Sequence, residues 1–166
     1  MAFSKRHSIV PLPGCVLTVM ALALLLGLLA FAQAPGVAHL TAPEAVTARA
    51  HSRVTANFQI AIQPGFHIQS NHPKLNYLIP SRIALAPAAG VSMVKVAWPH
   101  PKPHTFGFAP NQPLAVFEGT FTVPVVLKTG AAGKATLHGT FHYQACNDQL
   151  CRAPVTVPFT LTVHVH

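Results

Sequence analysis

The sequence predicts an all-β protein: an immunoglobulin-like antiparallel β-sandwich preceded by an N-terminal signal segment. Apolar and polar residues alternate along several short segments, which is the pattern of half-buried strands. Pro and Gly residues separate these segments, and no window outside the leader has a sustained helical periodicity. About seven short strands within residues 51–166 are typical of a sandwich, and a closed barrel is the structural alternative.

The leader has the composition of a secretory signal. Lys5 and Arg6 precede an uncharged, mostly apolar run over residues 15–34, which ends in small residues. We therefore expect residues 1–32 to be a signal peptide that is cleaved after Ala32. The run is also long enough to cross a bilayer, since a spanning helix needs about 20 residues, so an uncleaved anchor is the alternative.

The folded domain is predicted at residues 51–166. Residues 33–50 are rich in Ala and Pro without a sustained period, so we expect them to be a linker. The first strand is predicted at 54–62, where alternation is strict until Pro64 and Gly65 end it.

The other strands are predicted from the same alternation. They lie at 121–127, 137–143 and 157–165, with shorter candidates at 83–85 and 91–98. Pro124 and Pro158 interrupt two of these patterns. Because proline cannot donate a backbone hydrogen bond, we expect both at sheet edges or bulges.

The composition excludes several classes of function. The chain has eleven Lys and Arg residues and three acidic residues, and the basic residues form no run. The clustered basic surface of a nucleic-acid-binding protein is therefore not indicated. The three acids are Glu44, Glu118 and Asp148, scattered along the chain. Hydrolysis by a pair of carboxylates is therefore nearly excluded.

Two cysteines are the strongest candidates for chemistry. Cys146 and Cys151 follow the predicted strand 137–143, while Cys15 falls in the leader and has no expected function. In an exported protein such a close pair is normally a disulfide. A short ring gains little chain-entropy stabilisation, and exposed disulfides tend to exchange. A structural staple that holds a hairpin is the alternative.

Residues 143–154, with the sequence YQACNDQLCRAP, resemble the redox-active loop of the N-terminal periplasmic domain of the DsbD thiol:disulfide interchange family. The domains of this family are immunoglobulin-like and carry the pattern Y-Q-x-C…C-x-x-P. Residues 65–71 (GFHIQSN) are similar to an early family segment, and 77–80 and 98–99 add further similarity. The resemblance spans most of residues 51–163.

The resemblance implies a periplasmic disulfide shuttle without an organic cofactor, of the kind linked to cytochrome c biogenesis. In the family, the dithiol receives electrons from a membrane-embedded partner and passes them to thioredoxin-like periplasmic proteins. The accompanying membrane and thioredoxin-like domains of the family have no counterpart in this sequence. We therefore expect that the electron source is another protein, that the protein is a stand-alone receiver of electrons, or that the redox role has been lost. The cysteine spacing is also shorter than in the best-known member.

The resemblance also implies roles for individual residues. Cys151 would be the accessible sulfur that forms the mixed disulfide, and Cys146 would resolve it. Phe106 is the first candidate for the aromatic cap that covers the disulfide, and Phe108 is the second candidate. The predicted neighbours of the site are Tyr143, Asn147, Asp148, Arg152 and Pro154. Arg152 would favour a thiolate on Cys151, and Asp148 would oppose it.

Two rival functions are an accessory binding module with a structural disulfide and a metal-handling protein that uses its histidines. The histidines considered are His67, His72, His100, His104, His138, His142, His164 and His166. Along a strand, His138 and His142 would lie about 13 Å apart, too far to share one ion. His164 and His166 would lie about 7 Å apart and would need a neighbouring strand to help. We therefore expect solvated histidines and no dedicated metal site, with adventitious binding of Zn²⁺ or Cu²⁺ as the alternative.

Overall fold

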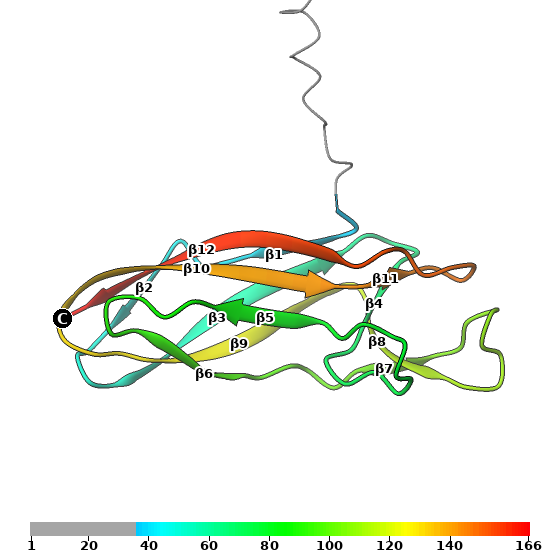
Figure 1. The fold of residues 1–166 in the computed structure, drawn as a ribbon, viewed down its shortest axis with the longest axis horizontal. Helices are drawn as coiled ribbons and strands as arrows, with labels where there is room; N and C mark the ends of the chain where they lie inside the picture. The colour runs from blue at the N-terminus through cyan, green and yellow to red at the C-terminus, as the bar shows by residue number, and fades with distance from the viewer. Residues whose placement is uncertain (1–35) are drawn as a thin grey trace, which may run out of the picture. The chain divides into compact units, whose positions relative to one another are not determined.

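The computed structural model describes residues 36–166, which form β-strands and no helix (Figure 1). The predicted signal peptide lies outside these residues. Within residues 36–166, no helix is long and apolar enough to cross a membrane. The strands are β1 (Ala38–Thr41), β2 (Ala45–Ala48), β3 (Arg53–Ile62), β4 (His67–Gln69), β5 (Arg82–Leu85), β6 (Ser92–Val96), β7 (Lys102–His104), β8 (Leu114–Phe117), β9 (Thr120–Lys128), β10 (Gly133–Tyr143), β11 (Ala145–Cys146) and β12 (Val155–Val165).

The strands form two large sheets and one small sheet. The large sheets have the orders β1-β3-β9-β6 and β2-β12-β10-β5, and all their pairs are antiparallel except β2 with β12. The small sheet, in the order β11-β4-β8-β7, lies at the end of the sandwich opposite the C-terminus (Figure 1). The predicted immunoglobulin-like, all-β class is confirmed.

The core forms because the alternating apolar residues of the long strands point to the same side. Buried residues of β3 and β9 pack with those of β10 and β12, and the Phe58 and Phe159 rings meet edge to face at 5.3 Å. The fully buried residues of these four strands include Phe58, Ile60, Val123, Val125, Leu127, Leu137, Phe141, Leu161 and Val163. The pattern that predicted the strands therefore also predicted the core.

The predicted linker is wrong over residues 38–48, which form β1 and β2. Strand β1 pairs with β3, beginning with Ala38 opposite Ile62, and β2 runs parallel to the end of β12. Each strand has only four residues, too few for alternation to stand out in an Ala- and Pro-rich composition. The paired edges of the long strands hold them in place.

The two strand prolines behave differently. Pro124 is neither at an edge nor at a bulge, since β9 lies between β3 and β6. The Pro124 carbonyl accepts a hydrogen bond from the N–H of Ala97, which lies just beyond the end of β6. Proline has no N–H group to donate, but at this position no paired residue of β6 requires a donor. Pro158 fits the prediction, because β2 pairs with β12 only from Thr162 onward and leaves that side of β12 open at Pro158.

The Tyr143 hydroxyl links the core to β1, and its loss should lower stability. It accepts a hydrogen bond from the buried N–H of Ala38 at 3.3 Å. We expect Tyr143→Phe to lower the free energy of unfolding by about 1–3 kcal/mol, because that N–H loses its acceptor. Denaturant unfolding measures the change. Tyr77→Phe is the matched control, since Tyr77 is exposed, and equal stability of the two variants would contradict the assignment.

Candidate functional site

The small sheet brings four segments of the chain to one end of the sandwich. Strand β11 pairs with β4, which places Cys146 opposite His67. Strand β4 pairs in turn with β8, and β8 pairs with β7, which ends at His104. Residues that lie far apart in the sequence therefore surround the cysteine.

A disulfide joins Cys146 and Cys151, and their Cα atoms lie 4.0 Å apart. Backbone hydrogen bonds close the loop: Asn147 N–H donates to the Leu150 carbonyl, and Arg152 N–H donates to the Ala145 carbonyl. The loop is therefore a tight hairpin fixed at its base.

The side chain of Asn147 shapes the same loop from within. Its Oδ1 accepts hydrogen bonds from the N–H groups of Gln149 at 3.0 Å and Leu150 at 2.9 Å. Asparagine commonly folds a turn in this way. The position of Asn147 beside the disulfide is thus explained by loop geometry.

The two sulfurs differ in their surroundings. Cys146 is fully buried, whereas Cys151 is only partly buried. The buried amide of Gln69 donates from Nε2 to the Cys146 Sγ at 3.2 Å. Cys151 is therefore the more exposed of the two cysteines, and Cys146 has a hydrogen-bond donor directed at its sulfur.

Phe106 packs over the disulfide in a small second core. It is 1% exposed and shares this cluster with Cys146, while Cys151 packs at its margin. Its buried aliphatic neighbours are Leu78, Leu114 and Val116. Phe108 stacks on Phe106 at 5.1 Å but is 42% exposed. Phe106 rather than Phe108 therefore belongs to the buried cluster that contains Cys146.

The segment around Phe106 contacts the cysteine loop at two further points. His104 Nε2 lies 3.2 Å from Asp148 Oδ1. A Cβ atom at Gly107 would lie 3.2 Å from the Asp148 carbonyl oxygen, so the two backbones approach closely where the side chain is smallest. These contacts join two loops that can separate only by breaking them.

The side chains of the remaining predicted neighbours make other contacts or are exposed. Tyr143 belongs to the main core, with its hydroxyl bonded to β1. Arg152 places its guanidinium 4.4 Å from the centroid of the Phe66 ring, a cation–π contact, and Pro154 is exposed. Of these three residues, Arg152 is the one whose backbone helps to form the cysteine loop.

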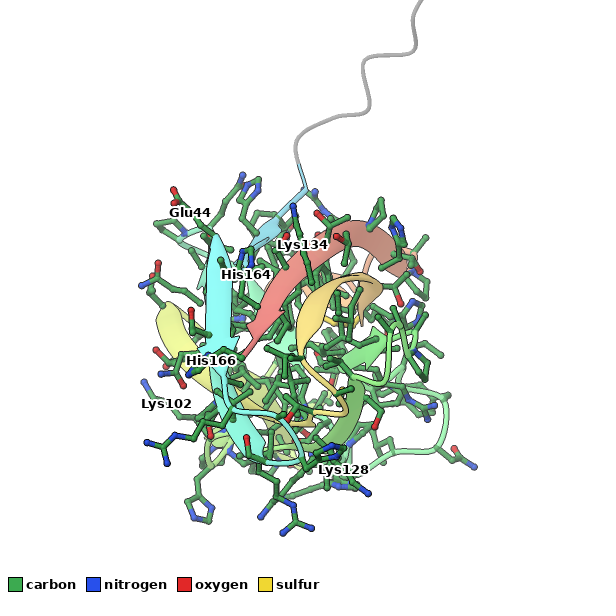
Figure 2. The ribbon with its side chains drawn as sticks, turned by 90° about the vertical axis from the view of Figure 1, so that its left-hand side faces the viewer. Glu44, Lys102, Lys128, Lys134, His164 and His166 are labelled. Atoms are coloured by element: carbon green, nitrogen blue, oxygen red, sulfur yellow. A yellow bond between two sulfur atoms is a disulfide. The ribbon has the colours of Figure 1, made fainter. Side chains whose placement is uncertain are left out.

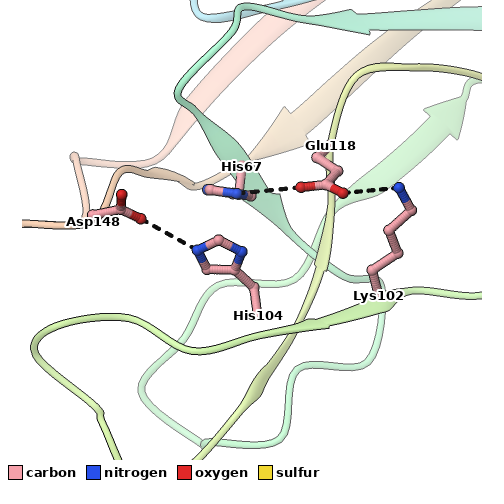
Figure 3. Close-up of polar contacts among 5 residues, drawn as sticks. All are labelled: His67, Lys102, His104, Glu118 and Asp148. Atoms are coloured by element: carbon pink, nitrogen blue, oxygen red, sulfur yellow. Dashed lines mark hydrogen bonds and ion pairs between the residues drawn. The ribbon is translucent and has the colours of Figure 1, made fainter.

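Figure 3 shows a polar cluster that includes His67, the residue opposite Cys146 in the β11–β4 pairing. His67 Nε2 is 3.4 Å from Glu118 Oε2, and Lys102 Nζ is 2.8 Å from Glu118 Oε1. The His67 and His104 rings lie 3.9 Å apart. Burial, together with the nearby His104, lowers the pKa of His67, and the hydrogen bond from Lys102 lowers the pKa of Glu118.

The expectation that the histidines are solvated is wrong for His67, which is buried. The others considered are exposed or partly exposed, and His164 and His166 lie at the C-terminal end of the sandwich, which faces the viewer in Figure 2. Sequence spacing could not bring His67, His104 and Glu118 together, because they come from three different segments. Gln69 was also missed as a partner of Cys146, although it lies in the 65–71 segment that carries part of the resemblance.

The fold and the site define a class: an immunoglobulin-like β-sandwich domain with a disulfide in an end loop, one sulfur of which shares a buried cluster with an aromatic side chain. A sequence model of the family described as "Thiol:disulfide interchange protein DsbD, N-terminal" matches residues 37–162. The chain belongs to this family.

One solved structure shares the fold at low sequence identity, and a second has a weaker similarity. The N-terminal periplasmic domain of ScsB from Proteus mirabilis has a TM-score of 0.52 and 16% identity, over 76% of this chain and 45% of that chain. This chain thus spans less than half the length of that structure. The DsbD N-terminal domain of Neisseria meningitidis in its reduced form has a TM-score of 0.46 and 15% identity, over 69% of this chain and 82% of that chain. No curated protein sequence matches this chain.

Proposed function

We propose that this domain performs thiol:disulfide exchange through Cys146 and Cys151 and passes electron pairs to or from thioredoxin-like proteins. One observation carries the proposal: in a member of the DsbD N-terminal family, a disulfide joins a partly exposed sulfur to a buried one beneath Phe106. A staple that served stability alone would gain little from so short a ring.

The exchange follows from the accessibility of the sulfurs. A partner thiolate attacks Cys151 Sγ, a new S–S bond forms, and the Cys146–Cys151 bond breaks with Cys146 leaving as a thiolate. The partner's second thiolate then attacks the partner sulfur that is bonded to Cys151 and releases Cys151 as a thiolate. The partner leaves as a disulfide, two electrons have moved to this domain, and both thiolates take up protons according to their pKa. The same steps in reverse return the electrons.

Gln69 supports the leaving group. A thiolate in a buried site is costly unless a donor compensates for lost hydration. The Gln69 Nε2–H group already points at Cys146 Sγ, so it can stabilise the charge that develops there as the bond breaks. Cys146 therefore acts as the leaving and resolving sulfur, and Cys151 as the sulfur that bonds to the partner.

Access to the disulfide requires movement of the cap. Phe106 fills the second core over Cys146, so a docking protein must displace it to reach the sulfurs. When the cap lifts, the His104–Asp148 contact breaks and the backbone at Gly107 moves away from Asp148. A closed cap protects the site from small thiols, and a partner surface opens it.

The proposed location is the periplasm. The signal-like leader and the membership of the DsbD N-terminal family support export, and an oxidising compartment is where a disulfide persists. A membrane thiol carrier is the proposed electron source, and oxidised thioredoxin-like proteins are the proposed acceptors.

The two single-cysteine variants should differ in their ability to trap a partner. Cys146→Ala leaves Cys151 partly exposed and removes the resolving thiol. The partner is a thioredoxin-like protein with a single active-site cysteine, which is activated as a disulfide. We expect a lasting mixed disulfide between Cys151 and this partner. Cys151→Ala, the matched control, leaves the buried Cys146 and should trap far less. Non-reducing electrophoresis with mass spectrometry measures the adduct.

Absence of an adduct with Cys146→Ala, or equal adducts with both variants, would contradict the proposal. The structural-disulfide alternative expects both variants to lose stability and neither to trap a partner. Thermal unfolding of the two variants, recorded alongside, separates these outcomes.

The cap proposal makes a kinetic prediction. Burial of a Phe side chain contributes about 1.5–3 kcal/mol, so Phe106→Ala should speed reduction of the disulfide by dithiothreitol on the order of tenfold to a hundredfold. Phe108→Ala is the matched control and should change the rate much less, because Phe108 is largely exposed. The rate is followed by quenched alkylation of free thiols. Equal rates in the two variants would show that Phe106 does not guard the disulfide.

A further inference from the structure

We propose that His67, His104 and Glu118 form a binding site for a divalent transition-metal ion such as Zn²⁺. Each residue offers one ligand atom, and these atoms all lie within 4.8 Å of one another. The three residues come from β4, from the end of β7 and from the segment that follows β8. An ion would therefore join three segments of the small-sheet region.

The ligand set suits such an ion. Imidazole nitrogens and a carboxylate oxygen bind Zn²⁺ at about 2.0–2.2 Å, so the ligand atoms around one tetrahedral ion lie about 3.3 Å apart. The His67 Nε2 and Glu118 Oε2 atoms are already 3.4 Å apart. His104 is partly exposed at the end of a short strand, so its ring can make the remaining shift of the order of 1 Å.

The surroundings hold His67 in place for this role. It is fixed by the β11–β4 pairing, it is 7% exposed, and its ring packs against His104 and edge to face against Phe106. The side chain therefore has little freedom to lose when an ion binds.

Asp148 is placed as an outer-shell partner of His104. Metal-bound histidines commonly bond their second ring nitrogen to a carboxylate. His104 Nε2 lies 3.2 Å from Asp148 Oδ1, and its other ring nitrogen lies on the side of His67 and Glu118 (Figure 3). With a proton on Nε2, the other nitrogen has a lone pair free for the ion.

Solvent can reach the site, and one residue opposes binding. An open depression of about 370 Å³ is lined by His67, Lys102 and Glu118, so an ion can enter and a water molecule can complete its coordination. Lys102 competes for the carboxylate, with its Nζ 2.8 Å from Glu118 Oε1. The site should thus bind more tightly when this lysine is removed.

The ion would restrain the cap. His104 is two residues before Phe106, and the other two ligands belong to the body of the small-sheet region. A bound ion would hold His104 against β4 and so keep Phe106 over the disulfide. This consequence rests on the proposed function, whereas the metal site itself does not.

Titration calorimetry with ZnCl₂ on the purified, disulfide-bonded protein tests the site. We expect one ion per chain with micromolar or tighter affinity, weakened at least about tenfold by His104→Ala and by Glu118→Gln. His138→Ala is the matched control, since His138 is exposed on β10, and should bind like the unchanged protein. Binding weaker than micromolar, or equal affinities for His104→Ala and His138→Ala, would overturn the site.

Lys102→Ala gives an effect of opposite sign. We expect it to tighten Zn²⁺ binding, while Lys95→Ala, which removes an equal charge from exposed β6, leaves the affinity nearly unchanged. Because Lys102 is exposed, this variant does not depend on a change in the core. Weaker or unchanged binding by Lys102→Ala would contradict the shared use of Glu118.

Hydrogen exchange of the amides in residues 104–108 tests the restraint on the cap. We expect added Zn²⁺ to slow their exchange in the unchanged protein and not in His104→Ala. Unchanged exchange at saturating Zn²⁺ would overturn the restraint. The partner-trapping experiment is run with chelator and without metal, so failure of the metal site and failure of the exchange chemistry are distinguishable.

Discussion

The pairing of β11 with β4 is the contact on which the candidate site depends. It is only two residues long, with Ala145 opposite Ile68 and Cys146 opposite His67. Through it the cysteine loop becomes the edge of the small sheet, and the Cys146 sulfur comes under Phe106 and within reach of Gln69. Without this pairing the loop would extend from β10 with no cover and no donor to its sulfur.

The difference in burial between the two sulfurs follows from this arrangement. Cys146 is held in the second core by the sheet, while Cys151 lies at the margin of that core. An exchange reaction needs one sulfur that a partner can reach and one that leaves and returns without escaping. The fold places one buried and one partly exposed sulfur within a loop of six residues, which is the arrangement that the proposed exchange requires. The polar cluster beside the disulfide uses the same sheet, because His67 is the direct partner of Cys146.

The sequence predicted most of the sandwich and only part of the site. The long strands β3, β9, β10 and β12 were predictable, since nine or more alternating residues leave a clear signal. The short strands β1, β2, β4, β7, β8 and β11 were not, because two to four residues carry no period and their stability comes from the strands beside them. The small sheet is made entirely of such strands.

The same limit explains which candidate site residues the sequence could suggest. Cys146, Cys151 and Phe106 were predicted through residue types and the family resemblance. Gln69 and Glu118 have ordinary residue types and act only through their neighbours in space, so no spacing along the chain identifies them. Tyr143 was predicted beside the site because of its place in the motif, yet the strict alternation of β10 directs its side chain into the main core.

The reduction potential of the Cys146–Cys151 pair tests the central claim most directly. Equilibration with glutathione redox buffers, followed by quantification of free thiols, measures it in the metal-free protein. We expect a potential above about −300 mV, in the range where thioredoxin-like proteins exchange electrons with the pair. A potential well below about −300 mV, which is typical of inert structural disulfides, would contradict the role of this domain in disulfide exchange.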